Sequence, residues 1–314
     1  MIRYCVQRVV SLVPVLVVVG VLTFALVRVI PGDPAQVLRG ESASPDEIAA
    51  VRHQLGLDQP VWLQFGRWVG SVATGDLGDS FSFNQPVLRV IADHYPPTLS
   101  IVLLASAFTI VLAIPLGILS AVKRGTPLDS LGMALALLGT ALPEFWTGMV
   151  LGLVFAVGLR WVPVAGYQPP TDGVLVWLST IVLPAAALGM SQVGVVARML
   201  RDGLIDALAD AYTTTARAKG LSPRQVIWDH ALRNTLVPTL TVLGNSLGGL
   251  LAGAVIIETV FNIRGFGWLA VQAVLQRDYP LVQGCVLLAA VTYSLVNLLV
   301  DISYGIADPR IRIA

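Results

Sequence analysis

Charged side chains are scarce in this 314-residue chain, and their scarcity indicates the class of protein. Asp, Glu, Lys and Arg make up 12% of the residues, against roughly 25% in soluble globular proteins. Hydrophobic residues make up 55%, and several uncharged runs approach the ~20 apolar residues that a membrane span needs. The composition therefore excludes an ordinary soluble protein and predicts an all-α membrane protein.

The side chains that bind metals or activate nucleophiles are also few. Cys5 and Cys285 are far apart in the sequence, so we expect free, buried thiols rather than a disulfide or a metal site. The three histidines are scattered without metal-ligand spacing, and no G-x-S-x-G or H-E-x-x-H motif occurs. Neither lysine, Lys123 or Lys219, follows a glycine, which excludes a phosphate-binding loop of the GxxxxGK[ST] type. We expect no catalytic site, no metal and no bound cofactor in this chain.

Long apolar runs predict six transmembrane helices. The run after Arg8 is longer than the apolar region of a signal peptide and no cleavage site follows it, so we expect a retained first helix. The third region is interrupted by Glu144, and neither half could cross alone, so it counts as one span. The six predicted spans are Val9–Val27, Leu99–Val122, Leu131–Leu159, Gly173–Ala197, Thr235–Ile257 and Tyr279–Val300.

The distribution of basic residues predicts the orientation of these spans. With the N-terminus inside, the short cytoplasmic flanks carry twelve Lys and Arg residues and the short external flanks carry four. The segment 31–98 is left out, because charges in loops longer than about 60 residues do not direct insertion. Both termini and the loop 198–234 are therefore predicted to lie in the cytoplasm.

The external segment 31–98 carries helix and turn signals of its own. Ser44 and Glu47 form a capping-box pattern and Gly56 is a plausible stop, which predicts a helix over 45–55. The tryptophan-bearing stretch Val61–Val72 is typical of an amphipathic helix lying along the membrane interface. Turns are expected at Gly75-Asp76-Leu77-Gly78 and at Tyr95-Pro96-Pro97. We thus divide the chain into a first helix (1–30), an external cap (31–98) and a membrane core of five further spans (99–314).

The chain is organised around a polar stretch, 210–238, that lies between two apolar runs. Gly220 follows Arg217 and Lys219, whose charges suit a helix C-terminus, and glycine favours the φ > 0 conformation that ends a helix. Ser222 and Pro223 are then typical of a helix start, with Gln225 completing a capping box. The pattern predicts a helix, a tight turn and a second helix that contact a soluble partner.

Polar residues inside the apolar runs indicate a possible path through the membrane. Pro143 would break the third span. Glu144 then faces a translocation cavity, lies at a re-entrant turn near the surface, or is neutralised by a packed neighbour. Glu258 and Asp301 lie near the ends of the fifth and sixth runs, where interfacial acids are common. In the fifth run Asn245, Gly248 and Gly249 are compatible with close helix packing or with a mobile helix that lines a pore. The spacing of these residues is compatible with both alternatives.

The polar stretch contains Thr214-Thr215-Ala216, then Gly220, and ends at Leu236-Val237-Pro238. This motif and several others resemble the dipeptide and oligopeptide branch of bacterial ABC importer permeases. The central one resembles the family's cytoplasmic "EAA" loop, although Thr214 and Thr215 stand where Glu and Ala are usual. Other matching stretches are Pro31-Gly32-Asp33-Pro34-Ala35, Gln54 to Pro60, Gly75 to Gly78, Val260-Phe261-Asn262 with Gly265-Phe266-Gly267, and Val300-Asp301 with Asp308-Pro309-Arg310. The coupling residues that the resemblance implies are Thr214, Thr215, Ala216, Arg217, Ala218, Lys219, Gly220, Leu221, Ser222, Pro223 and Pro238.

The resemblance also implies function and partners. It implies a subunit of a bacterial inner-membrane importer for peptides, paired with a second homologous permease, two cytoplasmic ATPase subunits that bind ATP and magnesium, and an external solute-binding protein. The external segment 31–98 and the loop 259–278 would contact that binding protein. Glutathione, nickel chelates or sugars are alternative cargoes. A different class remains open: an ion-gradient-driven secondary transporter using Glu144 or Glu258, or a membrane anchor for a soluble complex.

Overall fold

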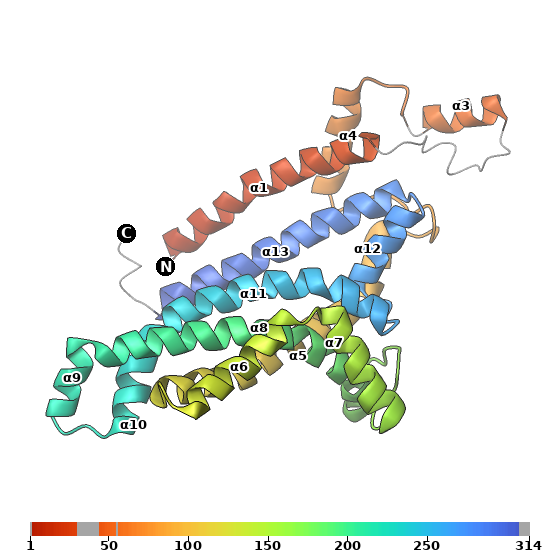
Figure 1. Cartoon of the computed structure of the whole chain (residues 1–314). Helices are drawn as coiled ribbons and strands as arrows, with labels where there is room; N and C mark the ends of the chain where they lie inside the picture. The colour runs from red at the N-terminus through yellow and green to blue at the C-terminus, as the bar shows by residue number, and fades with distance from the viewer. Residues whose placement is uncertain (1, 30–43, 55, 308–314) are drawn as a thin grey trace. The chain divides into compact units, whose positions relative to one another are not determined.

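The computed structural model describes residues 2–29, 44–54 and 56–307, and every regular element among them is a helix (Figure 1). The predicted motifs at Pro31–Ala35 and Asp308–Arg310 and the residue Leu55 lie outside the described residues. The helices are α1 (Ile2–Val29), α3 (Pro45–Gln54), α4 (Val61–Ala73), α5 (Val87–Val122), α6 (Pro127–Ala141), α7 (Glu144–Leu151), η1 (Gly152–Gly158), η2 (Pro170–Asp172), α8 (Val174–Ala209), α9 (Ala211–Ala218), α10 (Pro223–Gln225), η3 (Val226–Ala231), α11 (Leu232–Val260), α12 (Phe266–Leu275) and α13 (Tyr279–Ala307).

Most of the predicted spans coincide with long helices. Among the described residues, α5, α8, α11 and α13 are each long and apolar enough to cross a membrane, and the bent pair α6 and α7–η1 would make a fifth span. Within α1 the search for a span covers Val10–Ala25, an apolar stretch of the helix, so the first predicted span is not tested. The all-α membrane fold is therefore confirmed, whereas the count of six and the orientation stay predictions.

The chain divides into two compact units. Unit 1 contains residues 1–8, 97–264 and 295–314, and unit 2 contains residues 9–96 and 265–294. Unit 2 groups most of α1 and residues 265–294 with the segment that follows α1. The predicted boundaries at 30 and 98 stay predictions.

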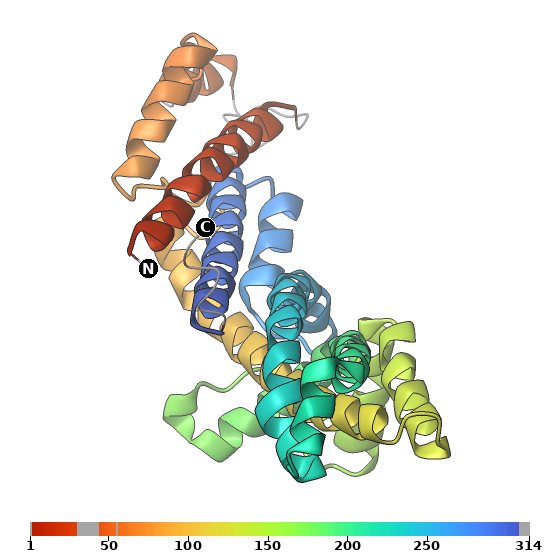
Figure 2. The same cartoon turned by 90° about the vertical axis from the view of Figure 1, so that its left-hand side faces the viewer.

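Helix α8 is the centre of unit 1. It packs against α6, α7 and α11, and α8 and α11 lie side by side in both views (Figures 1 and 2). Ile181 and Leu188 of α8, Ile101 of α5 and Ile257 of α11 are fully buried in one apolar cluster. A helix that is apolar around most of its circumference needs neighbours on several sides, and α8 has them.

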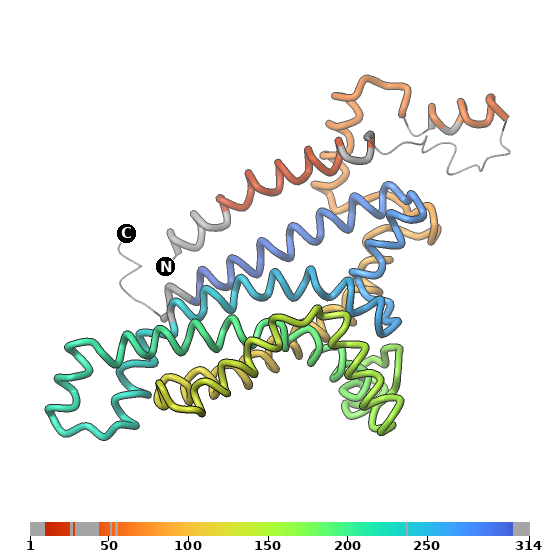
Figure 3. The backbone as a smooth tube through the Cα atoms, viewed as in Figure 1, coloured from red at the N-terminus to blue at the C-terminus, as the bar shows by residue number. Residues whose placement is uncertain are grey.

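The third predicted span is broken, as Pro143 suggested. Helix α6 ends at Ala141, and α7 starts at Glu144 after an extended Pro143 with ψ of 136°. The two halves meet at 102°, and the tube in Figure 3 shows the change of direction between them. Proline favours this break because it lacks a backbone N–H and its ring clashes with the preceding turn.

Unit 2 contains most of the segment 31–98 that the sequence predicts to be external, and the described part of it shows local structure. Helix α3 starts with the Ser44–Glu47 capping box, in which each residue's side chain accepts the other's backbone N–H. Gly56 follows the helix at φ of 64°. In α4, Phe65 and Trp68 pack around Phe24 of α1 with ring centroids 5.0 and 5.6 Å from it. The two predicted helices are confirmed; the position of α4 along the interface stays a prediction.

One of the two predicted turns is correct and the other is wrong. Gly75 and Gly78 adopt φ of 82° and 80°, as expected for the turn. Tyr95-Pro96-Pro97, in contrast, lies inside α5. Residues before the prolines, such as Ile91, and after them, such as Ile101, are buried in apolar clusters. Helices that are packed or in a membrane tolerate proline when neighbouring groups compensate for the lost hydrogen bonds, so packing overrides the local preference.

Candidate functional site

The polar stretch forms a compact helical hairpin between α8 and α11. Helix α8 continues to Ala209, and an extended Asp210 with ψ of 153° redirects the chain into α9. The predicted loop 198–234 is thus helical at both ends, and the long helices are interrupted only over 210–222. Figures 1 and 2 show α9 and α10 at the end of α8.

Buried side chains attach α9 to the helices beside it. Thr213 is fully buried and its hydroxyl donates to the carbonyl oxygens of Leu208 (3.1 Å) and Asp210 (2.8 Å). Ala216 is 6% exposed, one turn further along. Helix α9 contacts both α8 and η3. Because one face of α9 is buried against these elements, we expect the hairpin to move together with them.

Helix α9 ends at the predicted glycine turn, which has the hydrogen bonds of a Schellman motif. Gly220 adopts φ of 84°, its N–H donates to the Arg217 carbonyl (2.9 Å), and the Leu221 N–H donates to the Ala216 carbonyl (3.3 Å). These two bonds satisfy carbonyls at the end of the helix and define the Schellman motif. No neighbouring atom lies within 4 Å of the position of a Cβ on Gly220, so the backbone conformation alone requires glycine here.

The second half of the hairpin begins with the predicted capping box. The Gln225 N–H donates to Ser222 Oγ (3.4 Å), and the Ser222 N–H donates to Gln225 Oε1 (3.0 Å). Pro223 occupies the first helical turn, where its missing N–H costs nothing. The short α10 then continues through the π-helical η3 into α11, so the turn is directly joined to a long apolar helix.

The outer face of the hairpin is polar and exposed. Apart from the buried Ala216 and the partly exposed Leu221, the predicted contact residues between Thr214 and Pro223 are exposed. Pro238 lies within α11, away from the turn in sequence. The arrangement therefore presents basic and hydroxyl side chains on a rigid backbone, which suits contact with a protein surface.

The broken span places Glu144 against α8 and α11. Glu144 Oε1 accepts a hydrogen bond from Ser191 Oγ (2.8 Å), and Gln192 Nε2 donates to the same hydroxyl (3.3 Å). The position of a Cβ on Gly253 would be only 2.2 Å from Glu144 Oε2, so the small residue at 253 makes room for the acid. Glu144 is half-buried and in a polar cluster, not facing lipid alone.

The other predicted path residues do not all share one environment. Asn245 and Gly249 are exposed on the same face of α11, and Gly248 is half-buried beside them. Glu258 is fully buried and accepts a hydrogen bond from Thr98 of α5. The structure thus places Glu144 and the Gly249 face near one another through Gln192, while Glu258 belongs to the core.

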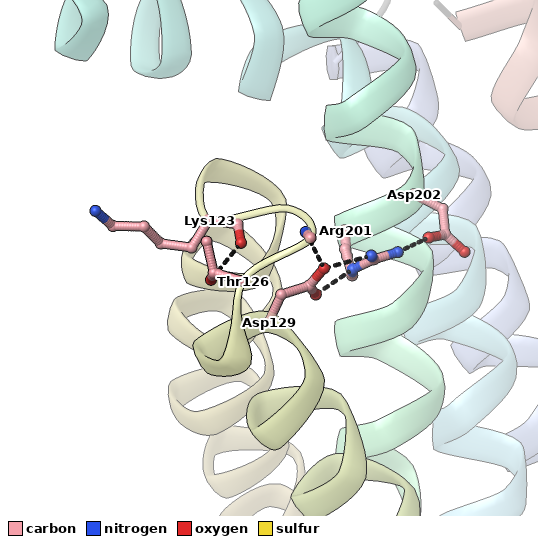
Figure 4. A network of polar contacts seen from close by, with 6 residues as sticks. Lys123, Thr126, Asp129, Arg201 and Asp202 are labelled. Carbon is pink, nitrogen blue, oxygen red and sulfur yellow. Dashed lines mark hydrogen bonds and ion pairs between the residues drawn. The ribbon is translucent and has the colours of Figure 1, made fainter.

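An ion pair that was not predicted from the sequence joins α6 to α8. Asp129 is 5% exposed and binds Arg201 through both carboxylate oxygens, as Figure 4 shows. Asp129 follows Pro127 in the first turn of α6. Acidic residues are common at this position of a helix because they interact favourably with the helix dipole, so the sequence does not indicate a partner for it. Only the antiparallel packing of the two helices brings Arg201 to it.

Comparison with known proteins assigns the family. Residues 113–313 match the family described as binding-protein-dependent transport system inner membrane component, and residues 1–102 match the N-terminal region of such membrane components. The chain belongs to this family. It is a multi-pass permease of the bacterial inner membrane and of the ABC importer class, which confirms the resemblance drawn from the sequence motifs.

Curated relatives are similar over nearly their whole length. A protein of Brucella abortus named as a peptide transport system permease is 44% identical over 306 residues, which cover 98% of both chains. The di/tripeptide transport system permease of Pseudomonas aeruginosa is 40% identical over 99% of both chains. The glutathione transport system permease of Salmonella paratyphi A is also 40% identical, again over 99% of both chains.

Solved structures share the fold at low sequence identity. A chain of the MetNI methionine ABC transporter in an inward-facing conformation superposes with a TM-score of 0.57 and 17% identity. The superposition covers 70% of this chain and 96% of that chain. An amino acid ABC transporter gives a TM-score of 0.53 at 14% identity, covering 69% and 94%. These similarities establish a common permease fold.

Proposed function

We propose that this chain forms half of the translocation pathway of an ATP-driven peptide importer. The names of its relatives support peptide as the cargo class, with glutathione as a further member of that class. The six spans with both termini in the cytoplasm complete this proposal, since they place the hairpin 210–222 and the basic flanks on the same side of the membrane.

The observation that carries the proposal is the doubly capped hairpin of α9 and α10. Its Schellman turn and capping box leave little freedom in the backbone, and its buried face is attached to α8 and η3. A rigid surface continuous with two long helices can convert a push from a partner into a helix movement. We propose that two ATPase subunits, which bind ATP and magnesium, dock on the exposed residues between Thr214 and Pro223.

The remaining partners follow from the same arrangement. A second homologous permease would complete the cavity, and an external solute-binding protein would deliver the cargo to the external segment 31–98 and the loop 259–278. On this chain Glu144, Asn245, Gly248 and Gly249 would line the path, because an intramembrane carboxylate needs a polar surrounding. Glu258, buried against Thr98, would support the core instead.

A substitution at Gly220 tests the coupling role. Valine at φ of 84° would be strained, so the turn should change shape while the protein still inserts into the membrane. In proteoliposomes that contain the complete importer, we expect Gly220→Val to lower the amount of peptide transported per ATP hydrolysed by at least about tenfold, the factor that corresponds to ~1.4 kcal/mol.

Gly166→Val is the matched control. Gly166 has φ of 94° and also has no neighbouring atom within 4 Å of its Cβ position, but it lies between η1 and η2, outside the hairpin. Both variants therefore introduce similar backbone strain. Wild-type transport per ATP in Gly220→Val, or an equal loss in both variants, would contradict the coupling role of the hairpin.

A further inference from the structure

At two glycines the backbones of helices α6 and α8 are in direct contact. The position of a Cβ on Gly139 would lie 2.7 Å from the carbonyl oxygen of Met190. The position of a Cβ on Gly194 would lie 2.3 Å from the carbonyl oxygen of Ala136. Each contact uses glycine on one helix and the backbone of the other, so no side chain separates the helices there.

The ion pair between Asp129 and Arg201 makes a third connection along the same pair of helices. Arg201 Nε and Nη2 lie 2.7 and 2.8 Å from Asp129 Oδ1 and Oδ2. The Gly125 N–H also donates to Asp129 Oδ2 (3.0 Å), so the carboxylate joins the turn before α6 to α8 (Figure 4). The Asp129 and Arg201 side chains are 7% and 23% exposed.

These contacts differ in what they resist. Close glycine contacts prevent the helices from approaching further, but they oppose sliding or separation only through weak dispersion forces. A two-pronged pair of guanidinium and carboxylate has a fixed geometry and resists both separation and rotation. Because Asp129 is nearly buried, separation would leave a charge without its partner in a poorly solvated place.

The position of the pair suggests what it does. Arg201 lies in the last turns of α8, shortly before Asp210 and the hairpin. At its other end α6 leads to the break at Pro143 and so to Glu144. The α6–α8 pair therefore connects the hairpin to the broken span through unit 1.

We propose that Asp129 and Arg201 are positioning residues that make α6 follow α8, so that movement of the hairpin reaches Glu144 at the broken span. The inference rests on the proposed coupling role of the hairpin. It adds a specific route: the ATPase moves α9, α9 moves the end of α8, and the ion pair carries α6 and the break at Pro143 along. Without the pair, α8 would move and α6 would lag behind.

The test is Asp129→Asn in the complete importer in proteoliposomes, with peptide transported per ATP hydrolysed as the measurement. We expect the ratio to fall by about 2- to 30-fold, the range by which single residues change coupling between distant sites. ATP hydrolysis itself should continue. Arg201→Lys keeps the charge and loses the two-pronged geometry, so we expect a smaller fall in the ratio. If the importer does not assemble with Asp129→Asn, Arg201→Lys replaces it as the test variant.

Asp202→Asn is the matched control. Asp202 binds the same guanidinium through Arg201 Nη1 (2.8 Å), but it lies beside Arg201 on α8 and is 55% exposed. Asp202→Asn removes one ion pair of Arg201 but keeps the ion pair between Arg201 and Asp129 that joins α8 to α6. We expect a wild-type ratio in this variant.

A distance measurement separates positioning from mere stability. Spin labels at Leu131 on α6 and Asp206 on α8, both exposed, would be introduced after replacement of Cys5 and Cys285. With Asp129 intact, we expect the same distance without nucleotide and with trapped ATP; with Asp129→Asn, the two distances should differ. A distance that changes while Asp129 is intact, or a wild-type transport ratio in Asp129→Asn, would overturn the proposal.

The outcome also distinguishes this inference from the coupling role of the hairpin. If Gly220→Val uncouples transport and Asp129→Asn does not, only the role of the ion pair is wrong. If Gly220→Val leaves the ratio unchanged, the coupling role itself is wrong.

Discussion

Single glycines do two different things in this permease. Gly220 is required by its backbone conformation, since φ is 84° and the surrounding space is open. Gly194 is required by space, since a side chain there would meet the carbonyl of Ala136. Gly253 likewise lies against Glu144 and Leu188, whereas Gly249 on the same helix is exposed. The small-residue spacing of the fifth run thus combines a packed glycine with an open one.

The crowding at Gly194 predicts a loss of stability. In Gly194→Ala the new methyl group would start 2.3 Å from the Ala136 carbonyl oxygen and 2.7 Å from Thr140 Cγ2, so α6 and α8 must separate. Overpacking of this kind costs about 1–3 kcal/mol. We expect a lower melting temperature in detergent for this variant.

Gly249→Ala is the control for that measurement. Its nearest atom, Gln192 Nε2, would be at 3.5 Å, an ordinary contact. Alanine is also better than glycine inside a helix by about 0.5–1 kcal/mol. An equal or higher melting temperature is expected, and a larger fall than in Gly194→Ala would contradict the packing argument.

At the scale of elements, caps decide where the helices of the hairpin and of the external segment begin and end. Ser222 with Gln225 and Ser44 with Glu47 both form the reciprocal hydrogen bonds that their spacing predicts. These bonds join residues only three positions apart, so the sequence contains all that is needed. The Tyr95-Pro96-Pro97 prediction failed for the opposite reason, because contacts distant in sequence hold α5 together.

The cap at Ser222 gives a local prediction. Ser222→Ala removes the acceptor of the Gln225 N–H, and loss of a serine cap costs about 0.5–2 kcal/mol. We expect faster amide hydrogen exchange over 222–226, with unchanged exchange in α8.

Ser179→Ala provides the comparison for the cap. Ser179 Oγ donates to the Val176 carbonyl within α8 and caps no helix. Slower or unchanged exchange over 222–226 in Ser222→Ala, or the same acceleration in both variants, would show that the capping box does not stabilise the turn.

At the scale of the whole molecule, buried polar groups join segments that are far apart in the chain. In unit 2 the fully buried Asp278 accepts hydrogen bonds from Ser80 Oγ (2.6 Å), the Ser82 N–H (2.9 Å) and the Leu281 N–H (3.2 Å). It therefore caps α13 and holds the segment before α5 against it. In unit 1 the ion pair of Asp129 and Arg201 holds α6 against α8.

Removal of the Asp278 carboxylate should loosen the external segment. Asp278→Ala leaves the Ser80 hydroxyl and the Ser82 N–H without their acceptor, and an unsatisfied buried group costs about 1–3 kcal/mol. We expect faster proteolysis between Gly75 and Pro86.

Asp76→Ala is the control, because Asp76 is exposed and accepts the N–H of its near neighbour Gly78. It should change the rate of cleavage much less. Equal rates for both variants would show that Asp278 does not anchor the segment.

The membrane class, most of the spans, the break at Pro143, the capped hairpin and the family could be predicted from the amino-acid sequence. All of these depend on composition, on apolar runs or on residues a few positions apart, so they are properties of local sequence. Other contacts could be identified only in the folded chain: Asp129 binds Arg201, Asp278 binds Ser80, and Glu144 lies against Gly253, while Glu258 is buried in the core. Such pairs depend on how helices pack, because the partners are brought together by the faces that neighbouring helices bury.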